Sequence, residues 1–270
     1  MPVSIANPHR GKELAGPGPY PAASADEVAR LLAHCPAHAP TPLLDLPGLA
    51  RRTGISRLHV KDESRRMGLG SFKALGAAYA IALEAASVVR GDDWTNALPD
   101  RIFVTASAGN HGLSVAAGAR IFGARAIIYL AETVPEAFAL RLRSKGAQVV
   151  RAGVTYEESM QAAERDAKAR GWTLLSDSSW PGYTKWPLRV MEGYLQLAAE
   201  AAGQIDAPPT HILLQAGVGG MAAAVATHAR TLWRGDLQII VVEPQAAPAL
   251  MESIRRGAVA TAAGRMAMAT

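Results

Sequence analysis

Lys73 stands where a side-chain amine could do covalent chemistry. Ser71 and Phe72 precede it, and it enters a predicted helix from a glycine-rich turn. Lysine amines form covalent bonds with carbonyl compounds in many enzymes. Most lysines are solvated surface charges, and the tripeptide alone does not separate the two possibilities. Lys73 is therefore a candidate for carrying an aldehyde cofactor, and other motifs must decide.

Two further turns of small residues follow predicted strands. One runs from Ser107 to Gly112 after an apolar strand, and the other is Gly217-Val218-Gly219-Gly220 after another. The first N–H groups of a helix have no partner within it, and the helix dipole adds partial positive charge at the same point. A phosphate fits such a turn, because missing side chains let the backbone approach closely. A tight turn without a ligand is the simpler alternative.

The second turn also matches a dinucleotide-binding pattern. Gly217-x-Gly219-x-x-Ala222 has the required spacing, and Glu243 ends the next predicted strand, where an acid that binds ribose is expected. Taken alone, this segment predicts NAD binding. A dinucleotide-binding domain explains neither a lysine after Phe72 nor the turn that begins at Ser107. The combination of motifs disfavours NAD.

Together these motifs resemble the fold-type II pyridoxal-phosphate enzymes, the group of threonine dehydratase, threonine synthase and diaminopropionate ammonia-lyase. The resemblance runs from about Leu58 to Pro244 and is strongest to diaminopropionate ammonia-lyase. It rests on Lys61-Asp62-Glu63-Ser64, on Gly68 to Gly76, on Asp177 to Tyr183, and on Met191, Gly193 and Tyr194.

The resemblance implies roles for single residues. Lys73 would hold pyridoxal 5'-phosphate as a Schiff base and, once freed, would remove the α-proton of an amino acid while the cofactor ring accepts electrons. Phe72 would lie at the cofactor, Asn110 would bond its ring hydroxyl, and the backbone of Gly217 to Gly220 would hold its phosphate. The substrate carboxylate would be bound by Ser107, Ala108, Gly109 and His111.

The implied activity is that of a carbon–nitrogen lyase. It would eliminate the β-substituent of 2,3-diaminopropionate or a similar amino acid, giving pyruvate or another 2-oxo acid and ammonia. Asp177 would be the second catalytic residue, although a turn cap before Ser178 explains it equally well. Ala108 stands where diaminopropionate ammonia-lyases carry an aspartate, as in threonine dehydratases. Threonine or serine dehydratase is therefore the alternative, and a catalytically impaired, cofactor-binding fragment is a third.

Strands and helices alternate along the chain, which predicts a parallel α/β fold. We expect two three-layer domains with the cofactor between them: a large one from residues 1–75 and 171–270, and a small inserted one from residues 76–170. Residues 1–40, rich in proline and glycine, predict a wrapping arm. Predicted strands lie at 58–60, 102–105, 126–130, 148–150, 173–175, 211–215 and 238–242. Predicted helices lie at 24–32, 71–86, 110–122, 135–145, 155–169 and 187–202, with one more after Gly220.

The resemblance also implies further strands beyond Thr270, so the chain is expected to be truncated at its C-terminus. The composition argues against several classes of binding partner. The net charge of +5 is scattered without a nucleic-acid-binding stripe, and no apolar run reaches the ~20 residues of a membrane helix. The lone Cys35 excludes an intrachain disulfide and a cysteine-cluster metal site, which fits the cytoplasm. We expect a metal-free homodimer that acts on a small amino acid.

Overall fold

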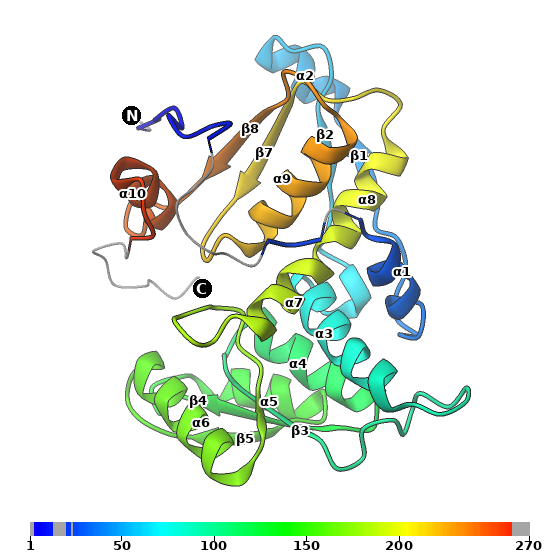
Figure 1. The fold of residues 1–270 in the computed structure, drawn as a ribbon, viewed down its shortest axis with the longest axis vertical. Coiled ribbons are helices and arrows are strands. Elements are labelled where there is room, and N and C mark those ends of the chain that lie inside the picture. Colours follow the sequence, from blue (N-terminus) through cyan, green and yellow to red (C-terminus); the bar gives the residue numbers. More distant parts are fainter. Residues whose placement is uncertain (1–2, 13–19, 23, 261–270) are drawn as a thin grey trace.

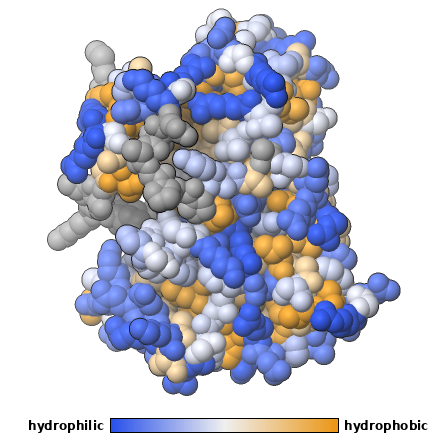
Figure 2. All heavy atoms as spheres, in the orientation of Figure 1, coloured by the Kyte–Doolittle hydropathy of each residue, from blue (hydrophilic) through white to orange (hydrophobic). Residues whose placement is uncertain are grey.

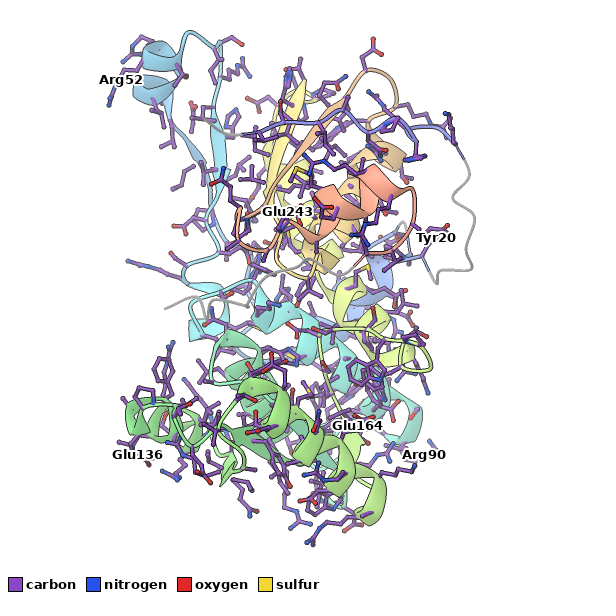
Figure 3. All side chains as sticks on the ribbon, turned by 90° about the vertical axis from the view of Figure 1, so that its left-hand side faces the viewer. Tyr20, Arg52, Arg90, Glu136, Glu164 and Glu243 are labelled. Atoms are coloured by element: carbon purple, nitrogen blue, oxygen red, sulfur yellow. The ribbon has the colours of Figure 1, made fainter. Side chains whose placement is uncertain are left out.

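Three sheets organise the described part of the chain: a four-stranded sheet lies towards the lower end of the molecule, and two sheets of two strands each lie towards the upper end (Figure 1). The computed structural model describes residues 3–12, 20–22 and 24–260. Helices α3 (Lys73–Val88) and α7 (Lys185–Gly193) lie between the two ends of the molecule. On the face seen in Figure 2 polar and apolar residues are interspersed, and charged side chains such as Glu136, Glu164 and Arg90 project from the lower half in Figure 3. In the described part of the chain, no helix is long and apolar enough to cross a membrane.

The lower sheet has four parallel strands in the order β5-β4-β3-β6. Their bounds are β3 Ile102–Ala106, β4 Arg125–Leu130, β5 Gln148–Arg151 and β6 Thr173–Leu174. Successive side chains of a strand point to opposite faces, so Phe103 packs into one buried cluster and Val104 into another. Helices cover both faces, as parallel sheets require. They are α4 (Asn110–Ile121), α5 (Glu136–Ser144) and α6 (Tyr156–Arg170).

The upper part of the molecule contains a second parallel pair, β7 (His211–Gln215) and β8 (Gln238–Val242), joined through α9 (Gly220–Leu232). Leu213 and Val242 on this pair are 65% and 54% exposed. An antiparallel pair lies nearby, formed by β1 (Leu43–Asp45) and β2 (His59–Lys61). The remaining elements are α1 (Asp26–Leu32), α2 (Pro47–Thr53), the short 3₁₀ helix η1 (Arg66–Gly68), α8 (Leu195–Gln204) and α10 (Ala249–Arg256).

Two glycines let α3 and α7 approach at backbone distance. A Cβ added to Gly76 would lie 2.7 Å from Val190 Cγ1 and 2.8 Å from Tyr194 Cε1, and one added to Gly193 would lie 2.6 Å from the carbonyl oxygen of Leu75. Such contacts leave no room for a side chain. The crossing therefore fixes the start of α3, and with it Lys73, against the end of α7.

A buried ionic cluster ties the segment before α3 to α8. We call Lys61, Glu63, Arg66 and Glu200 the Arg66 cluster. The guanidinium of Arg66 is fully buried and donates to Glu63 at 2.7 Å and to Glu200 at 2.7 and 2.9 Å. Lys61 Nζ donates to Glu200 at 2.8 Å. Because both acids are anchored, the strand β2 and the turn that leads to Lys73 are held against α8.

The parallel α/β fold predicted from the sequence is confirmed, with three differences in detail. The single helix expected at 187–202 is wrong: α7 and α8 are separate helices that meet at Tyr194. Strand β6 pairs with β3, so it belongs to the four-stranded sheet although it lies beyond residue 170. The domain boundaries stay a prediction. Elements β1, α2 and α10 were not expected.

The N-terminal segment packs against later parts of the chain where the structure describes it. His9 Nε2 lies 3.3 Å from the carbonyl oxygen of Ile254, and the N–H of Ala22 donates to Glu192 at 3.3 Å. Residues 13–19 of the expected arm lie outside the described residues. The described contacts join this segment to α10 and α7.

Candidate active site

The backbone of Lys73 is held at the first position of α3. Its N–H donates to Ser71 Oγ at 3.3 Å, so the residue two positions earlier shapes the turn into the helix. From α4, Ser114 Oγ donates to the carbonyl oxygens of Lys73 and Ala74 at 2.7 and 3.1 Å. The side chain of Lys73 remains 26% exposed. A fixed backbone with an accessible amine is what a covalent attachment point requires.

Lys73 Nζ forms an ion pair with Asp177 Oδ2. Asp177 follows β6 and is 16% exposed. Burial alone would raise the pKa of Asp177, but the charge of His111 and the ion pair with Lys73 outweigh it and lower the pKa to about 2. The carboxylate is therefore ionised at neutral pH. The structure thus brings together the two residues that the sequence proposed as catalytic.

His111 lies beside Asp177 and is 5% exposed. Its Nε2 lies 2.8 Å from the carbonyl oxygen of Leu175. A carbonyl oxygen can only accept, so Nε2 carries a proton and donates it to Leu175. The other ring nitrogen, Nδ1, is buried without a partner among the described residues. The imidazole is oriented by the strand end that leads to Asp177, and one of its nitrogens is left for a ligand.

The turn from Ser107 to Asn110 joins β3 to α4. A Cβ added to Gly112 would lie 2.2 Å from the carbonyl oxygen of Ser107, so the helix start folds back closely on the turn and only glycine fits there. Ser107 and Ala108 are half-buried, whereas Gly109 and Asn110 are exposed. Their expected roles towards cofactor and substrate stay predictions.

The Gly217–Gly220 turn ends β7 and begins α9. Gly219 caps the helix with a φ of +93°, a left-handed conformation that strongly favours glycine. A Cβ added at Gly217 or Gly219 would meet nothing within 4 Å, so open space lies before this backbone. Val218 is 56% exposed. The unpaired N–H groups at the start of α9 face a space that could receive an anion.

A cavity of about 220 Å³ lies between Asp177 and the Gly217–Gly220 turn, and among the described residues its lining does not include Lys73, Phe72 or His111. Asp177, Tyr194, Gly219 and Gly220 line it, together with apolar side chains of α7. Phe72 packs edge-on against Tyr194 with ring centroids 5.1 Å apart. Among the described residues, the lining includes neither Asn110 nor the turn at 107–109. Sequence reasoning assigned no role to Tyr194, which was one of several matched residues in a predicted helix. The helix break at Tyr194 leaves no signal in the sequence.

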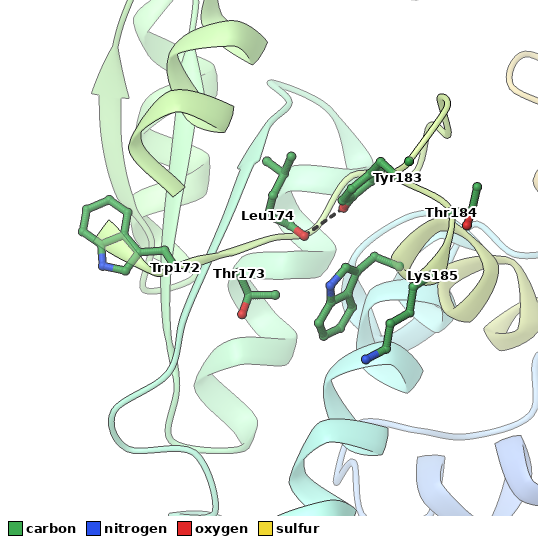
Figure 4. A pocket seen from close by; sticks show the side chains of 8 residues that line it. Trp172, Thr173, Leu174, Tyr183, Thr184 and Lys185 are labelled. Atoms are coloured by element: carbon green, nitrogen blue, oxygen red, sulfur yellow. Dashed lines mark hydrogen bonds between the residues drawn. The ribbon is translucent and has the colours of Figure 1, made fainter. Parts of the chain in front are cut away.

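A larger cavity of about 320 Å³ is lined by residues 172–174 and 182–186 (Figure 4). Trp172, Lys185 and Trp186 contribute to its lining. Tyr183 closes one side: its hydroxyl donates to the carbonyl oxygen of Leu174 at 2.8 Å and accepts from the N–H of Ser176 at 2.9 Å. The lining contains none of the predicted site residues. Lys185 is the amine found here, and the glycine in this lining, Gly182, lies in the tight turn that Trp180 and Tyr183 close with backbone hydrogen bonds.

Glu243 removes the support for a dinucleotide. Its two carboxylate oxygens accept from the N–H groups of Leu250 and Met251 at 2.8 and 2.9 Å. The acid that a dinucleotide site would use on ribose thus holds the start of α10 instead. The glycine turn remains, without the partner that the dinucleotide pattern requires.

Comparison with known proteins decides the family. The model of the family "Pyridoxal-phosphate dependent enzyme" matches residues 35–270. This chain belongs to that family. Its cofactor, expected from the sequence, is pyridoxal 5'-phosphate, and the residues fit it: an accessible amine at Lys73 and open space before the turn at Gly219.

Relatives narrow the comparison further. A diaminopropionate ammonia-lyase of Salmonella typhimurium is 36% identical over 244 residues, which are 84% of this chain and 60% of the relative. An L-serine dehydratase/L-threonine deaminase of Mus musculus is 30% identical over 225 residues, 83% of this chain and 63% of the relative. This chain therefore spans less than two thirds of the length of these relatives.

A solved structure of a diaminopropionate ammonia-lyase has a similar fold. Diaminopropionate ammonia lyase from Escherichia coli, in complex with an aminoacrylate-PLP azomethine reaction intermediate, superimposes with a TM-score of 0.80 at 33% identity. The match covers 89% of this chain and 64% of that one. The fold-type II architecture expected from the sequence is confirmed.

Proposed function

We propose that this protein is a pyridoxal-phosphate-dependent ammonia-lyase that acts on 2,3-diaminopropionate or a similar β-substituted amino acid. The observation that carries the proposal is the ion pair of Lys73 with Asp177 beside a cavity that the Gly219–Gly220 turn closes. The carboxylate pairs with the amine and lines the same cavity as the start of α9, whose first N–H groups would bind an anion. The similarity to diaminopropionate ammonia-lyases supports the choice of substrate.

The cofactor would be held from two sides. Lys73 Nζ would attach to its aldehyde carbon, and the N–H groups at the start of α9 would bind its phosphate. When bound, the pyridine ring supplies an electron sink for the carbanion formed at the substrate's α-carbon. The edge-on packing of Phe72 on Tyr194 would form an apolar wall near Lys73. Such a wall excludes water from the reacting atoms.

Lys73 and Asp177 would divide the proton chemistry. The free amine of Lys73 would take the α-proton, because it lies at a fixed helix start and is accessible. Asp177 would stabilise the ammonium that results, as it does in the ion pair of this structure. Its charge would also pair with the β-ammonium of diaminopropionate, a group that serine and threonine lack.

Ala108 favours a second candidate, threonine or serine dehydratase. A methyl group at this half-buried turn position can neither donate nor accept a proton, so Asp177 alone would recognise a β-ammonium. The similarity to the serine dehydratase/threonine deaminase of Mus musculus supports this alternative. A cofactor-binding protein with impaired catalysis is the third candidate.

The experiment is to add pyridoxal 5'-phosphate to the purified chain and to measure ammonia and 2-oxo acid release. The substrates are both diaminopropionate enantiomers, L-serine and L-threonine, and heat-denatured protein with the same cofactor is the control. Release of both products fastest from a diaminopropionate supports the proposal. Faster turnover of serine or threonine would replace it with the dehydratase. Bound cofactor without turnover on any of the four would leave the binding protein.

A homodimer in the cytoplasm completes the proposal. The dimer rests on the resemblance to the family alone, and sedimentation equilibrium of the cofactor-loaded protein tests it. The compartment is consistent with Cys35, which is buried and free. Burial raises the pKa of its thiol to about 12, so it would stay unreactive in a reducing compartment.

A further inference from the structure

The hydroxyl of Tyr194 is buried without a partner. The residue is 2% exposed, and Oη has no hydrogen-bond partner among the described residues. Buried hydroxyl groups in proteins are nearly always hydrogen-bonded, and each exception calls for an explanation. Tyr194 is also rigid: it sits between α7 and α8, and its ring packs against Phe72. A mobile side chain that misses its partner by chance does not account for this hydroxyl.

The hydroxyl end of the ring lies beside the start of α9. Tyr194 Cε2, next to the carbon that bears Oη, is 3.8 Å from the position of a Cβ on Gly220. Both residues line the 220 Å³ cavity. The charged side chain among the described lining residues, the carboxylate of Asp177, is already paired with Lys73. The cavity wall at this end therefore presents donors: the first N–H groups of α9 and the phenol.

The phenol keeps its proton in this place. Burial, and then the negative charge of Asp177, raise the pKa of Tyr194 well above its usual value. A neutral phenol has one O–H to donate. Several donors that converge without an acceptor are satisfied together by a group with several acceptor oxygens, and a phosphate is such a group.

We propose that Tyr194 is a positioning residue that donates its hydroxyl hydrogen to the anion bound at the N-terminus of α9. Under the proposed function, on which this inference rests, that anion is the phosphate of the cofactor. Tyr194 would fix the cofactor's phosphate end while Lys73 fixes its aldehyde end. The close α3–α7 crossing at Gly76 and Gly193 would set the distance between the two anchors.

The test compares two ligands on matched variants. Tyr194→Phe keeps the ring and its contact with Phe72 but removes the hydroxyl. Tyr79→Phe is the control, because Tyr79 is also buried, at 3% exposure, but lies on α3 near Glu192 and Glu27 and outside the cavity lining. Dissociation constants are measured by absorbance for pyridoxal 5'-phosphate and for pyridoxal, which has the aldehyde without the phosphate.

We expect Tyr194→Phe to weaken pyridoxal 5'-phosphate binding about tenfold to a hundredfold, the usual effect of losing a hydrogen bond to a charged group. Pyridoxal binding should not change, and Tyr79→Phe should alter neither constant. Equal losses for both ligands would show that the hydroxyl does not act on the phosphate. An unchanged constant for pyridoxal 5'-phosphate would also overturn the inference.

Inorganic phosphate separates this inference from the proposed function. With tyrosine rings labelled for NMR, the Tyr194 signal of the wild type should shift on saturation with inorganic phosphate, and the Tyr79 signal should not. This measurement does not depend on a variant that folds. If the wild type binds no pyridoxal 5'-phosphate but Tyr194 responds to phosphate, the proposed function fails and the anion site stands. If the wild type binds pyridoxal 5'-phosphate but the Tyr194 signal does not shift with inorganic phosphate, only this inference fails.

Discussion

The Arg66 cluster and the Lys73 site are both built around ion pairs, buried in the first and partly exposed in the second, and their surroundings differ. In the Arg66 cluster every guanidinium nitrogen of Arg66 has an acceptor, among them Glu63, Glu200 and the carbonyl oxygen of Ala39. Around Lys73, by contrast, Tyr194 Oη and His111 Nδ1 are buried without partners in the part of the chain that is described. Gln196 Oε1 and His38 Nδ1 beside the Arg66 cluster are also buried without described partners, so the contrast is that the unpaired Tyr194 hydroxyl lies on a cavity.

The pKa of the central carboxylate does not distinguish the two groups, whereas the cavity beside one of them does. The pKa of Glu200 is lowered to about 2, because its bonds to Arg66 and Lys61 outweigh the opposing effect of burial. The pKa of Asp177 is also about 2. A strongly shifted carboxylate can thus belong to a scaffold or to a site. The difference lies in the surroundings, since the unpaired hydroxyl of Tyr194 lies on a cavity with Asp177, whereas the carboxylates of Glu63 and Glu200 are taken up by Arg66 and Lys61.

The largest effect should come from Lys73→Ala. Removing the amine removes both the covalent attachment and the proton acceptor, so ammonia release should fall by at least ~10³-fold. Weak cofactor binding should survive, because the turn at Gly219 still offers its N–H groups. Borohydride reduction followed by peptide mapping of the wild type should label Lys73. A label on Lys185, which lines the larger cavity, would instead place the active site in that cavity. Lys185→Ala is the matched control and should retain ammonia release.

The next largest effect should be on stability, from Arg66→Ala. It leaves Glu63 and Glu200 buried without their main partner, and breaking a buried ion pair from one side costs about 3–5 kcal/mol of unfolding free energy. Lys73→Ala should cost less, because both members of its pair are partly exposed. Urea unfolding of both variants compares the two regions directly. A larger loss for Lys73→Ala would reverse their assignment as scaffold and site.

Local sequence patterns predicted the motifs of the candidate site, whereas features that depend on long-range contacts could not be predicted from the sequence. Lys73 and the turn at Gly217 were found because each follows a strand-turn-helix pattern that can be read within a few residues. The pairing of Arg66 with Glu200 could not be found in that way, since the residues are 134 positions apart. Strand β1 was missed for a related reason: three residues give no periodicity, and only its pairing with β2 makes it a strand.

The break at Tyr194 shows the same limit. Residues 187–202 have a continuous helical pattern, which predicted one helix. The structure divides them because Gly193 must fit against the backbone of α3, a contact that depends on the whole fold. The donor that the sequence overlooked is located at that break. Tertiary packing thus created the feature on which the anion site depends.

A smaller, selective effect should come from Asp177→Asn. A buried contact between a carboxylate and an ammonium commonly contributes ~2–5 kcal/mol when one partner is removed. The kcat/KM for diaminopropionate should therefore fall by more than about tenfold relative to that for serine or threonine. Steady-state kinetics on the three substrates measure this ratio. Equal losses on all three would reduce Asp177 to a structural turn cap and favour the dehydratase.

The smallest effect should come from Gly219→Ala, and it tests whether the open turn is a binding site. A left-handed φ costs a residue with a Cβ about 1–2 kcal/mol, so the unfolding free energy should fall by that amount. Gly171, which ends α6 with a φ of +68° and has no atom within 4 Å of an added Cβ, provides the control. Gly171→Ala should lose similar stability. Only at Gly219 would the added methyl occupy the space before the start of α9, so only Gly219→Ala should also weaken pyridoxal 5'-phosphate binding in an absorbance titration. Equal cofactor affinity in the two variants would mean that Gly219 is required only for the left-handed backbone conformation of the turn. The anion would then have to bind elsewhere in the cavity.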